Sequence, residues 1–196
     1  MKKTFKKIVS ISLLAVVILT SCSKDDDPTP VTYQEENPLI GYLTNGGING
    51  AVVDVVDGTT SEIGNEFTPS VNGKMNAITV SLPAVNTNLR VTIWNATTKT
   101  AIRTEYVNVA TAATAITKNI ASVPLQKDTK YAITMNSNDW YYREKSNGSL
   151  ISYPITSGNI RFESFGYTET PGQLYPLQFS NDYYYGDLSF IFQQTE

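Results

Sequence analysis

The chain has 196 residues with 15 basic and 18 acidic side chains, no histidine and a single cysteine, Cys22. The lack of histidine excludes a Ser-His-Asp triad, a Cys-His pair and metal sites built on imidazole. One cysteine cannot form a disulfide within the chain, so packing and hydrogen bonds must hold the fold together. An acidic chain is also a poor partner for nucleic acid, which binds basic surfaces.

Residues 1–21 predict a lipoprotein signal peptide. Four lysines near the N-terminus precede an apolar run over residues 8–19. This run is shorter than the roughly 20 residues that span a bilayer, and it has the length of a signal-peptide core. Leu19-Thr20-Ser21-Cys22 resembles the lipobox of bacterial lipoproteins. The resemblance implies cleavage before Cys22 and acylation of its sulfur; the alternative is a plain secretory peptide with an unrelated cysteine.

The segment after Cys22 bears on location. Ser23-Lys24-Asp25-Asp26-Asp27 resembles the acidic export signal of Bacteroidota-type lipoproteins. That resemblance implies an outer-membrane lipid anchor at Cys22 that faces the cell exterior, and the membrane is then a partner through the lipid. The alternative is a solvated acidic linker without an address function. After cleavage the chain has 11 basic and 18 acidic residues, a net charge of −7, which suits a soluble extracellular domain.

Residues 22–49 predict the acylated cysteine followed by an acidic, flexible tether. This segment is rich in Asp, Glu, Pro and Gly and has no amphipathic period, as is typical of disordered linkers. We expect the first contact with the folded domain at residues 38–42 and a turn-rich hinge at residues 45–50.

Residues 50–196 predict one all-β domain, an antiparallel β-sandwich of the jelly-roll or immunoglobulin-like kind with about nine strands. Thr, Val, Ile and Tyr are abundant and helical periodicity is absent. Turn signals such as Asp57-Gly58 and Asn72-Gly73 separate the alternating runs. The expected strands cover residues 51–56, 62–67, 75–82, 89–94, 100–109, 114–123, 131–135, 160–165 and 188–192.

Several segments resemble a family of exported bacterial domains of unknown function. Glu62-Ile63-Gly64-Asn65-Glu66-Phe67 is similar to its "ELGxxF" opening, and Ile93-Trp94 is similar to its "LW" strand. Residues 181–190 resemble its closing "NYxxDxxF" motif. The resemblance implies a β-sandwich without an established activity. Residues 108–122 lack the family's glycine-tryptophan segment, so a surface built on that segment is not expected here.

Two segments of the chain repeat an Asn-Asp pair followed by three aromatic residues. Side chains alternate along a strand, so at least one ring in each segment must face solvent or a groove. An exposed ring can stack on a sugar while nearby polar groups bind its hydroxyls; the alternative is that the rings stabilise strand pairs. The candidate ligand-binding residues are Asp139, Trp140, Tyr141, Tyr142, Arg143, Asp182, Tyr183, Tyr184 and Tyr185.

Two further candidates concern structure. Trp94 alternates with Leu89, Val91 and Ile93, so we expect it on the opposite face of that strand, as the core tryptophan, with the Leu/Val/Ile face packed elsewhere. A structural calcium ion would need oxygen ligands, and the conceivable ones are Asp54, Asp57, Glu62 and Asp187. The alternative is that these carboxylates are solvated. No other cofactor or metal is expected.

These observations favour a surface-anchored, non-catalytic lipoprotein that binds glycan or another extracellular ligand through exposed aromatics. The alternative is a structural or adhesive cell-surface module that pairs with other proteins. A hydrolase is the least expected function, since it would need two carboxylates about 5 to 9 Å apart in one cleft. The available ones are Asp139, Glu144, Glu163, Asp182 and Asp187.

Overall fold

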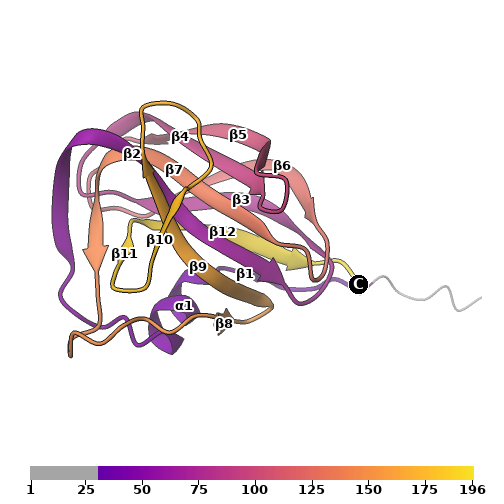
Figure 1. Cartoon of the computed structure of the whole chain (residues 1–196). Helices are drawn as coiled ribbons and strands as arrows, with labels where there is room; N and C mark the ends of the chain where they lie inside the picture. The colour runs from indigo at the N-terminus through magenta and orange to yellow at the C-terminus, as the bar shows by residue number, and fades with distance from the viewer. Residues whose placement is uncertain (1–30) are drawn as a thin grey trace, which may run out of the picture. The chain divides into compact units, whose positions relative to one another are not determined.

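Two antiparallel sheets pack face to face across one apolar core, which confirms the predicted all-β sandwich (Figure 1). The computed structural model describes residues 31–196, and residues 32–196 form one compact unit. The signal peptide, Cys22 and the acidic export signal lie outside the described residues.

The smaller sheet has the strand order β1-β12-β3-β6 and the larger sheet has the order β10-β9-β2-β7-β4-β5. Two short strands lie off this path, β11 beside β7 and β8 beside β9. The smaller sheet consists of β1 (Glu35–Glu36), β12 (Asp187–Gln194), β3 (Gly73–Ser81) and β6 (Ile116–Leu125). The larger sheet consists of β10 (Gln178–Ser180), β9 (Ile160–Glu169), β2 (Val53–Pro69), β7 (Tyr131–Arg143), β4 (Asn86–Asn95), β5 (Thr100–Val109), β11 (Tyr184–Tyr185) and β8 (Ile155–Ser157).

Strand alternation explains the core. Leu89, Val91 and Ile93 of β4 are fully buried between the sheets, as period-2 side-chain placement requires. Trp94 lies on the opposite face of β4, as predicted, but the expectation that it is the core tryptophan is wrong: it is buried in a second cluster with Tyr175, outside the core between the sheets. This cluster lies on the outer face of the larger sheet and is covered by the loop after β9.

The first two expected strands, residues 51–56 and 62–67, are one strand, so the predicted Asp57-Gly58 turn is wrong. β2 runs for 17 residues, and its register against β7 shifts between Val56 and Ser61. Both halves of β2 pair with the same long strand β7. The shared partner accommodates Asp57-Gly58 as a local irregularity, as β-bulges do.

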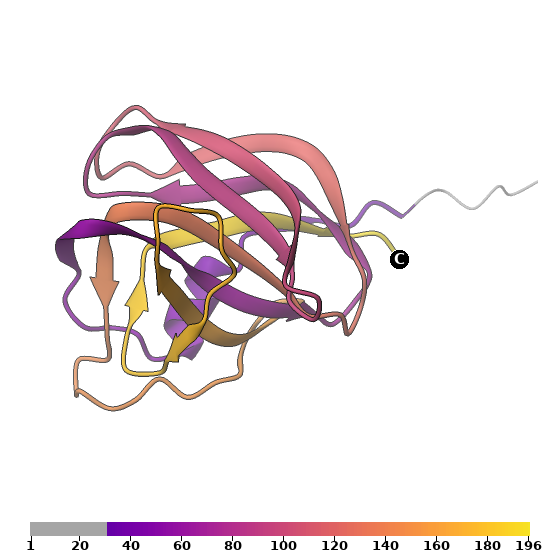
Figure 2. The same cartoon turned by 45° about the horizontal axis from the view of Figure 1, so that its top comes forward.

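The prediction of a flexible tether over residues 22–49 is wrong for its second half, which is folded onto the sandwich. β1 pairs with β12, and the helix α1 (Leu39–Asn45) lies against β8 and β12 at one end of the sandwich (Figure 1 and Figure 2). Tyr42 in α1 is completely buried and Ile48 after it is nearly so. Residues 39, 42 and 43 present a helical apolar face, but the helix has only seven residues, too few for periodicity to stand out in an acidic, proline-containing segment.

Candidate functional site

A two-stranded ribbon brings the two predicted aromatic segments together. β11 pairs antiparallel with the end of β7, so that Tyr185 lies opposite Tyr142 and Tyr184 lies opposite Arg143. The two strands of this ribbon are about 40 residues apart in the sequence. The ribbon therefore concentrates rings that the sequence presents as two separate candidates.

Strand alternation then divides these residues between the core and the surface. Trp140 and Tyr184 are 3% and 1% exposed, so neither of these two candidate residues presents an exposed ring to a ligand. Trp140 lies opposite Val55 of β2, and Tyr184 packs edge-on against Tyr42. The tyrosines beside them in sequence, at positions 141, 142, 183 and 185, are half-buried.

Among the described residues, Arg143 forms no ion pair with either candidate aspartate. The guanidinium of Arg143 donates two hydrogen bonds of 2.7 Å to the carboxylate of Asp187, which raises the pKa of the arginine. Asp182 is exposed beside Tyr183. Asp139 lies opposite Val56 and thus on the face of β7 away from Trp140. Burial, followed by repulsion from Asp54, raises the pKa of Asp139.

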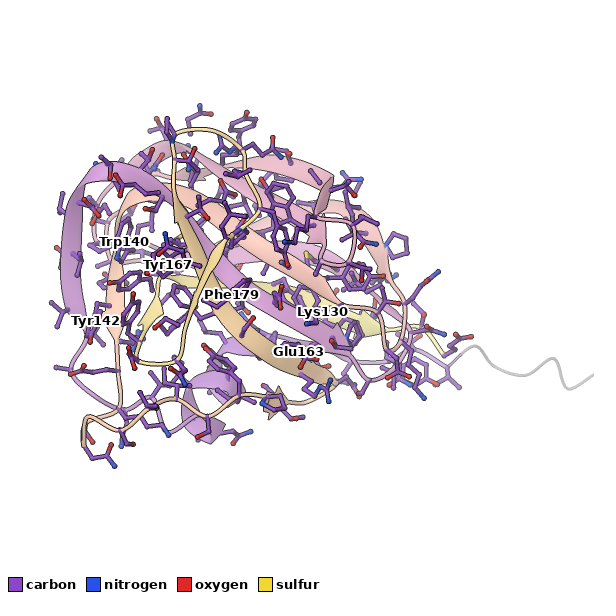
Figure 3. The ribbon with its side chains drawn as sticks, viewed as in Figure 1. Lys130, Trp140, Tyr142, Glu163, Tyr167 and Phe179 are labelled. Carbon is purple, nitrogen blue, oxygen red and sulfur yellow. The ribbon has the colours of Figure 1, made fainter. Side chains whose placement is uncertain are left out.

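A groove with a cavity volume of about 240 Å³ opens where β2, β9, β10 and the ribbon meet. Figure 3 shows Trp140, Tyr142 and Tyr167 gathered on one side of the domain, away from Lys130 and Glu163. Apolar and aromatic side chains line most of the groove, and four polar residues complete it. The lining residues are Val55, Asp57, Ser61, Ile63, Trp140, Tyr167, Glu169, Gln178, Tyr183 and Tyr185.

The aromatic rings of this groove form a connected set. Tyr183 and Tyr185 stack with ring centroids 4.5 Å apart and planes 20° apart. Trp140 lies 5.3 Å from Tyr185, and Tyr167 lies 6.4 Å from Tyr183. Tyr142 packs against both stacked rings from the side, with centroids at 5.8 Å. Such contacts stabilise ring pairs by about 0.5–1.5 kcal/mol in addition to the energy of burying their area. The rings therefore keep this arrangement before any ligand binds.

Two polar features mark the aromatic site. The hydroxyl of Tyr142 donates a 2.5 Å hydrogen bond to Glu144, and this bond raises the pKa of Tyr142 to about 12. Among the described residues, the buried Nε1 of Trp140 has no hydrogen-bond acceptor. Unpaired buried donors are rare because each costs about 1–3 kcal/mol. A tryptophan that floors a groove and keeps a free N–H is therefore unusual.

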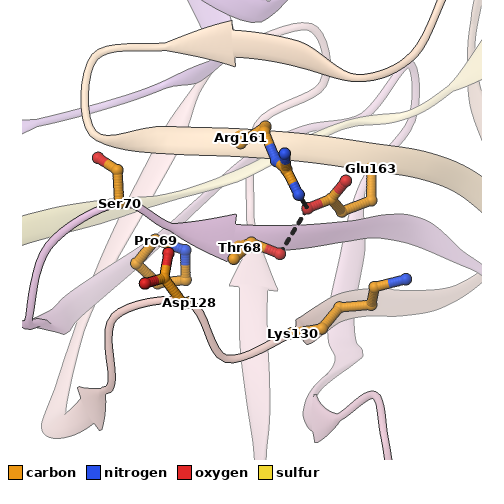
Figure 4. A pocket seen from close by; sticks show the side chains of 7 residues that line it. All are labelled: Thr68, Pro69, Ser70, Asp128, Lys130, Arg161 and Glu163. Atoms are coloured by element: carbon orange, nitrogen blue, oxygen red, sulfur yellow. Dashed lines mark hydrogen bonds and ion pairs between the residues drawn. The ribbon is translucent and has the colours of Figure 1, made fainter.

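A second, larger pocket of about 420 Å³ lies near the start of β9 (Figure 4). Three of its four charged side chains, Lys130, Arg161 and Glu163, take part in ion pairs. Arg161 pairs with Glu163 at 2.8 Å, and Thr68 donates a 2.6 Å hydrogen bond to the same carboxylate. Lys130 reaches Glu66 at 3.3 Å. The pocket has no aromatic lining residue, and a ligand would have to break existing ion pairs, so we favour the aromatic groove.

Two of the four carboxylates proposed as calcium ligands, Glu62 and Asp187, have other partners. Glu62 is buried, accepts hydrogen bonds from Arg90 at 2.9 Å and Thr134 at 2.5 Å, and has a pKa raised by burial. Asp187 is bound to Arg143. Within residues 31–196, no group of three or more potential ligands is placed to hold a metal ion. The same residues contain no helix long and apolar enough to cross a membrane.

Sequence reasoning missed Tyr167, Gln178 and Ile63 as groove residues. Tyr167 and Gln178 are opposite each other in the β9–β10 pair, and Ile63 lies opposite Tyr167 in β2. The three positions have no shared motif, so only the strand register brings them together.

A scan against protein-family models and a search of curated proteins gave no match to this chain. The resemblance to exported domains of unknown function therefore stays a prediction, and any function must be argued from the groove itself.

Proposed function

We propose that this protein is a non-catalytic, glycan-binding lipoprotein and that the aromatic groove holds the sugar. The observation that carries the proposal is the stacked, half-buried pair Tyr183 and Tyr185 above the buried Trp140, with polar groups at the rim. Sugar sites combine an apolar platform with a few placed hydrogen-bonding groups. The side chains of Ser61 and Gln178 offer such groups within the groove.

The size of the groove supports a partly enclosed ligand. Its volume of about 240 Å³ is below the roughly 300–1,000 Å³ of pockets that enclose drug-sized molecules. A groove of this size suits one or two sugar rings of a longer chain that continues into solvent.

The strand edges favour this function over pairing with another protein. Two of the four sheet edges are very short, with two residues in β1 and three in β10. The long edges β5 and β6 are bridged by Lys118, which donates hydrogen bonds to Glu105 at 2.8 Å and to the carbonyl of Tyr106 at 2.9 Å. Short edges and lysines placed over edges discourage strand addition.

The location is part of the same proposal. Acylation at Cys22 with two or more chains would hold the protein stably in a membrane, whereas one chain would not. The acidic segment after Cys22 would direct it to the outer face of the outer membrane, where extracellular glycans are accessible.

The test is a glycan-array screen of the chain from residue 22 onward, with Cys22→Ser to prevent acylation. Tyr183→Ala and Tyr185→Ala should each weaken binding by about tenfold or more, as expected for a ring at the centre of a site. Trp140 and Tyr184 are unsuitable for this test because truncation of buried rings destabilises the fold.

Tyr106→Ala is the matched control, since Tyr106 is 54% exposed and lies on β5, which contributes no residue to the groove. This variant should bind as the unmodified chain does. Absence of binding to every glycan would reject the proposed function, and equal losses in all three variants would place the site elsewhere.

A further inference from the structure

We infer that the groove selects sugars by charge: it accepts neutral sugars, prefers sugars with a protonated amine, and rejects uronic or sulfated glycans. This inference rests on the proposed glycan-binding function and adds the chemical class of the ligand.

The first observation is the charge of the groove lining. Two of the lining residues are acidic, Asp57 and Glu169, and none is basic. Both side chains are exposed at the rim. Within residues 31–196 neither of them takes part in an ion pair, unlike Glu163 of the larger pocket. These two negative charges are therefore available to a ligand.

The second observation is that the cation nearest in sequence to these rings is already engaged. Arg143 follows the aromatic segment of β7, but both carboxylate oxygens of Asp187 hold its guanidinium at 2.7 Å. Further negative charge lies around the ribbon, with Glu144 bound to the hydroxyl of Tyr142 and Asp182 exposed next to Tyr183. An acidic sugar would meet like charge without a free arginine or lysine in the groove to pair with it.

The third observation is the combination of these charges with stacked rings. A protonated amine is attracted both to the face of an aromatic ring and to a carboxylate. Tyr183 and Tyr185 supply the ring faces, and Asp57 and Glu169 supply the carboxylates of the same groove. Neutral sugars gain only the stacking and hydrogen bonds, so they should bind less tightly than amino sugars.

The experiment compares three β-1,4-linked pentasaccharides that differ in one substituent: glucose, glucosamine and glucuronic acid. Binding is measured by titration calorimetry at about pH 5.5, where the amine is protonated and ordinary carboxylates are ionised. Exposed charge pairs are weak because water and salt screen them. We therefore expect the glucosamine oligomer to bind about fivefold tighter than the glucose oligomer at low salt. The glucuronic acid oligomer should show no measurable binding.

Two variants test the cause of the preference. Asp57→Asn combined with Glu169→Gln should reduce the affinity ratio of the glucosamine oligomer to the glucose oligomer from about five to about one, because the two negative charges are removed while side-chain shape is kept. High salt should have a similar effect on the unmodified chain, since exposed charges are screened.

The outcomes separate this inference from the proposed function. Equal binding of all three oligomers, or tighter binding of the glucuronic acid oligomer, would overturn the inference and leave a glycan-binding groove in place. Equal loss for the glucose and glucosamine oligomers in the double variant would show that the carboxylates maintain the groove, which also overturns it. Binding of no oligomer would overturn it as well, and the glycan array would then decide whether the proposed function survives.

Discussion

Tyr42→Ala tests whether the segment before the sheets belongs to the folded domain. The ring of Tyr42 is fully buried and lies 4.5 Å from Phe162 and 5.0 Å from Tyr184 between ring centroids. Its hydroxyl shares a 2.5 Å hydrogen bond with Tyr153. A seven-residue helix has no stability of its own, so this ring is the main contact that holds α1 on the sandwich.

Loss of a buried aromatic ring costs about 3–5 kcal/mol. Domains of this size are stable by only about 5–15 kcal/mol, so the variant should lose a large part of its free energy of unfolding. For a domain of 150–250 residues, each kcal/mol shifts Tm by roughly 2–4 °C. We therefore expect Tyr42→Ala to lower Tm by about 6–20 °C.

The assay is equilibrium unfolding in urea, followed by tryptophan fluorescence, together with a thermal scan. Tyr42→Phe keeps the ring and removes the hydroxyl, so it should cost about 1–2 kcal/mol. Ile40→Ala is the matched control, because Ile40 lies in the same helix and is 76% exposed; it should change stability by less than about 0.5 kcal/mol. If Tyr42→Ala were as mild as this control, α1 would not be docked, and a flexible tether up to residue 49 would be correct.

Three further predictions concern ionisation, a buried ion pair and a turn. Because Glu144 raises the pKa of Tyr142 to about 12, Tyr142→Phe should remove one late tyrosine from a spectrophotometric titration. The raised pKa means that the stability due to this bond is complete below about pH 10 and is lost as the pH rises toward 12. Glu62→Ala should lower the free energy of unfolding in urea by about 3–5 kcal/mol, since it leaves a largely buried arginine without its carboxylate. Gly186→Ala should weaken glycan binding in the array assay, because its φ is +78° and a Cβ atom would lie 2.3 Å from a methionine methyl group. Gly148→Ala has a similar φ of +68° in open space, so it should cost only about 1–2 kcal/mol and leave binding unchanged.

The features that could be predicted from sequence depend on local alternation. Leu89, Val91 and Ile93 alternate with polar residues in the sequence, and the structure buries all three in the core. The same alternation places Trp94 on the other face of β4. The sequence predicts about nine strands, whereas the described residues contain twelve. The additional strands β1, β8, β10 and β11 have only two or three residues each, too few for a period of two to be recognised.

The errors share a physical cause, which is tertiary pairing that local patterns do not encode. Asp57-Gly58 favours a turn, but the chain remains extended because β7 pairs with β2 on both sides of it. The sequence does not distinguish Trp140 and Tyr184 from the tyrosines beside them, but opposing strands and α1 bury these two rings. In each case a distant segment supplies contacts that outweigh the local preference.

The candidate site depends on the point where the chain moves from one sheet to the other. β11 belongs to the ribbon of the larger sheet and β12 belongs to the smaller sheet, with Gly186 alone between them. The N–H of Gly186 donates a 2.7 Å hydrogen bond to the carbonyl of Tyr141, which ties this corner to β7. Only glycine readily adopts the required positive φ. The corner directs Leu188 and Phe190 into the core while the stacked Tyr183 and Tyr185 remain at the groove. The residue that closes the sandwich therefore also positions the rings of the proposed sugar platform.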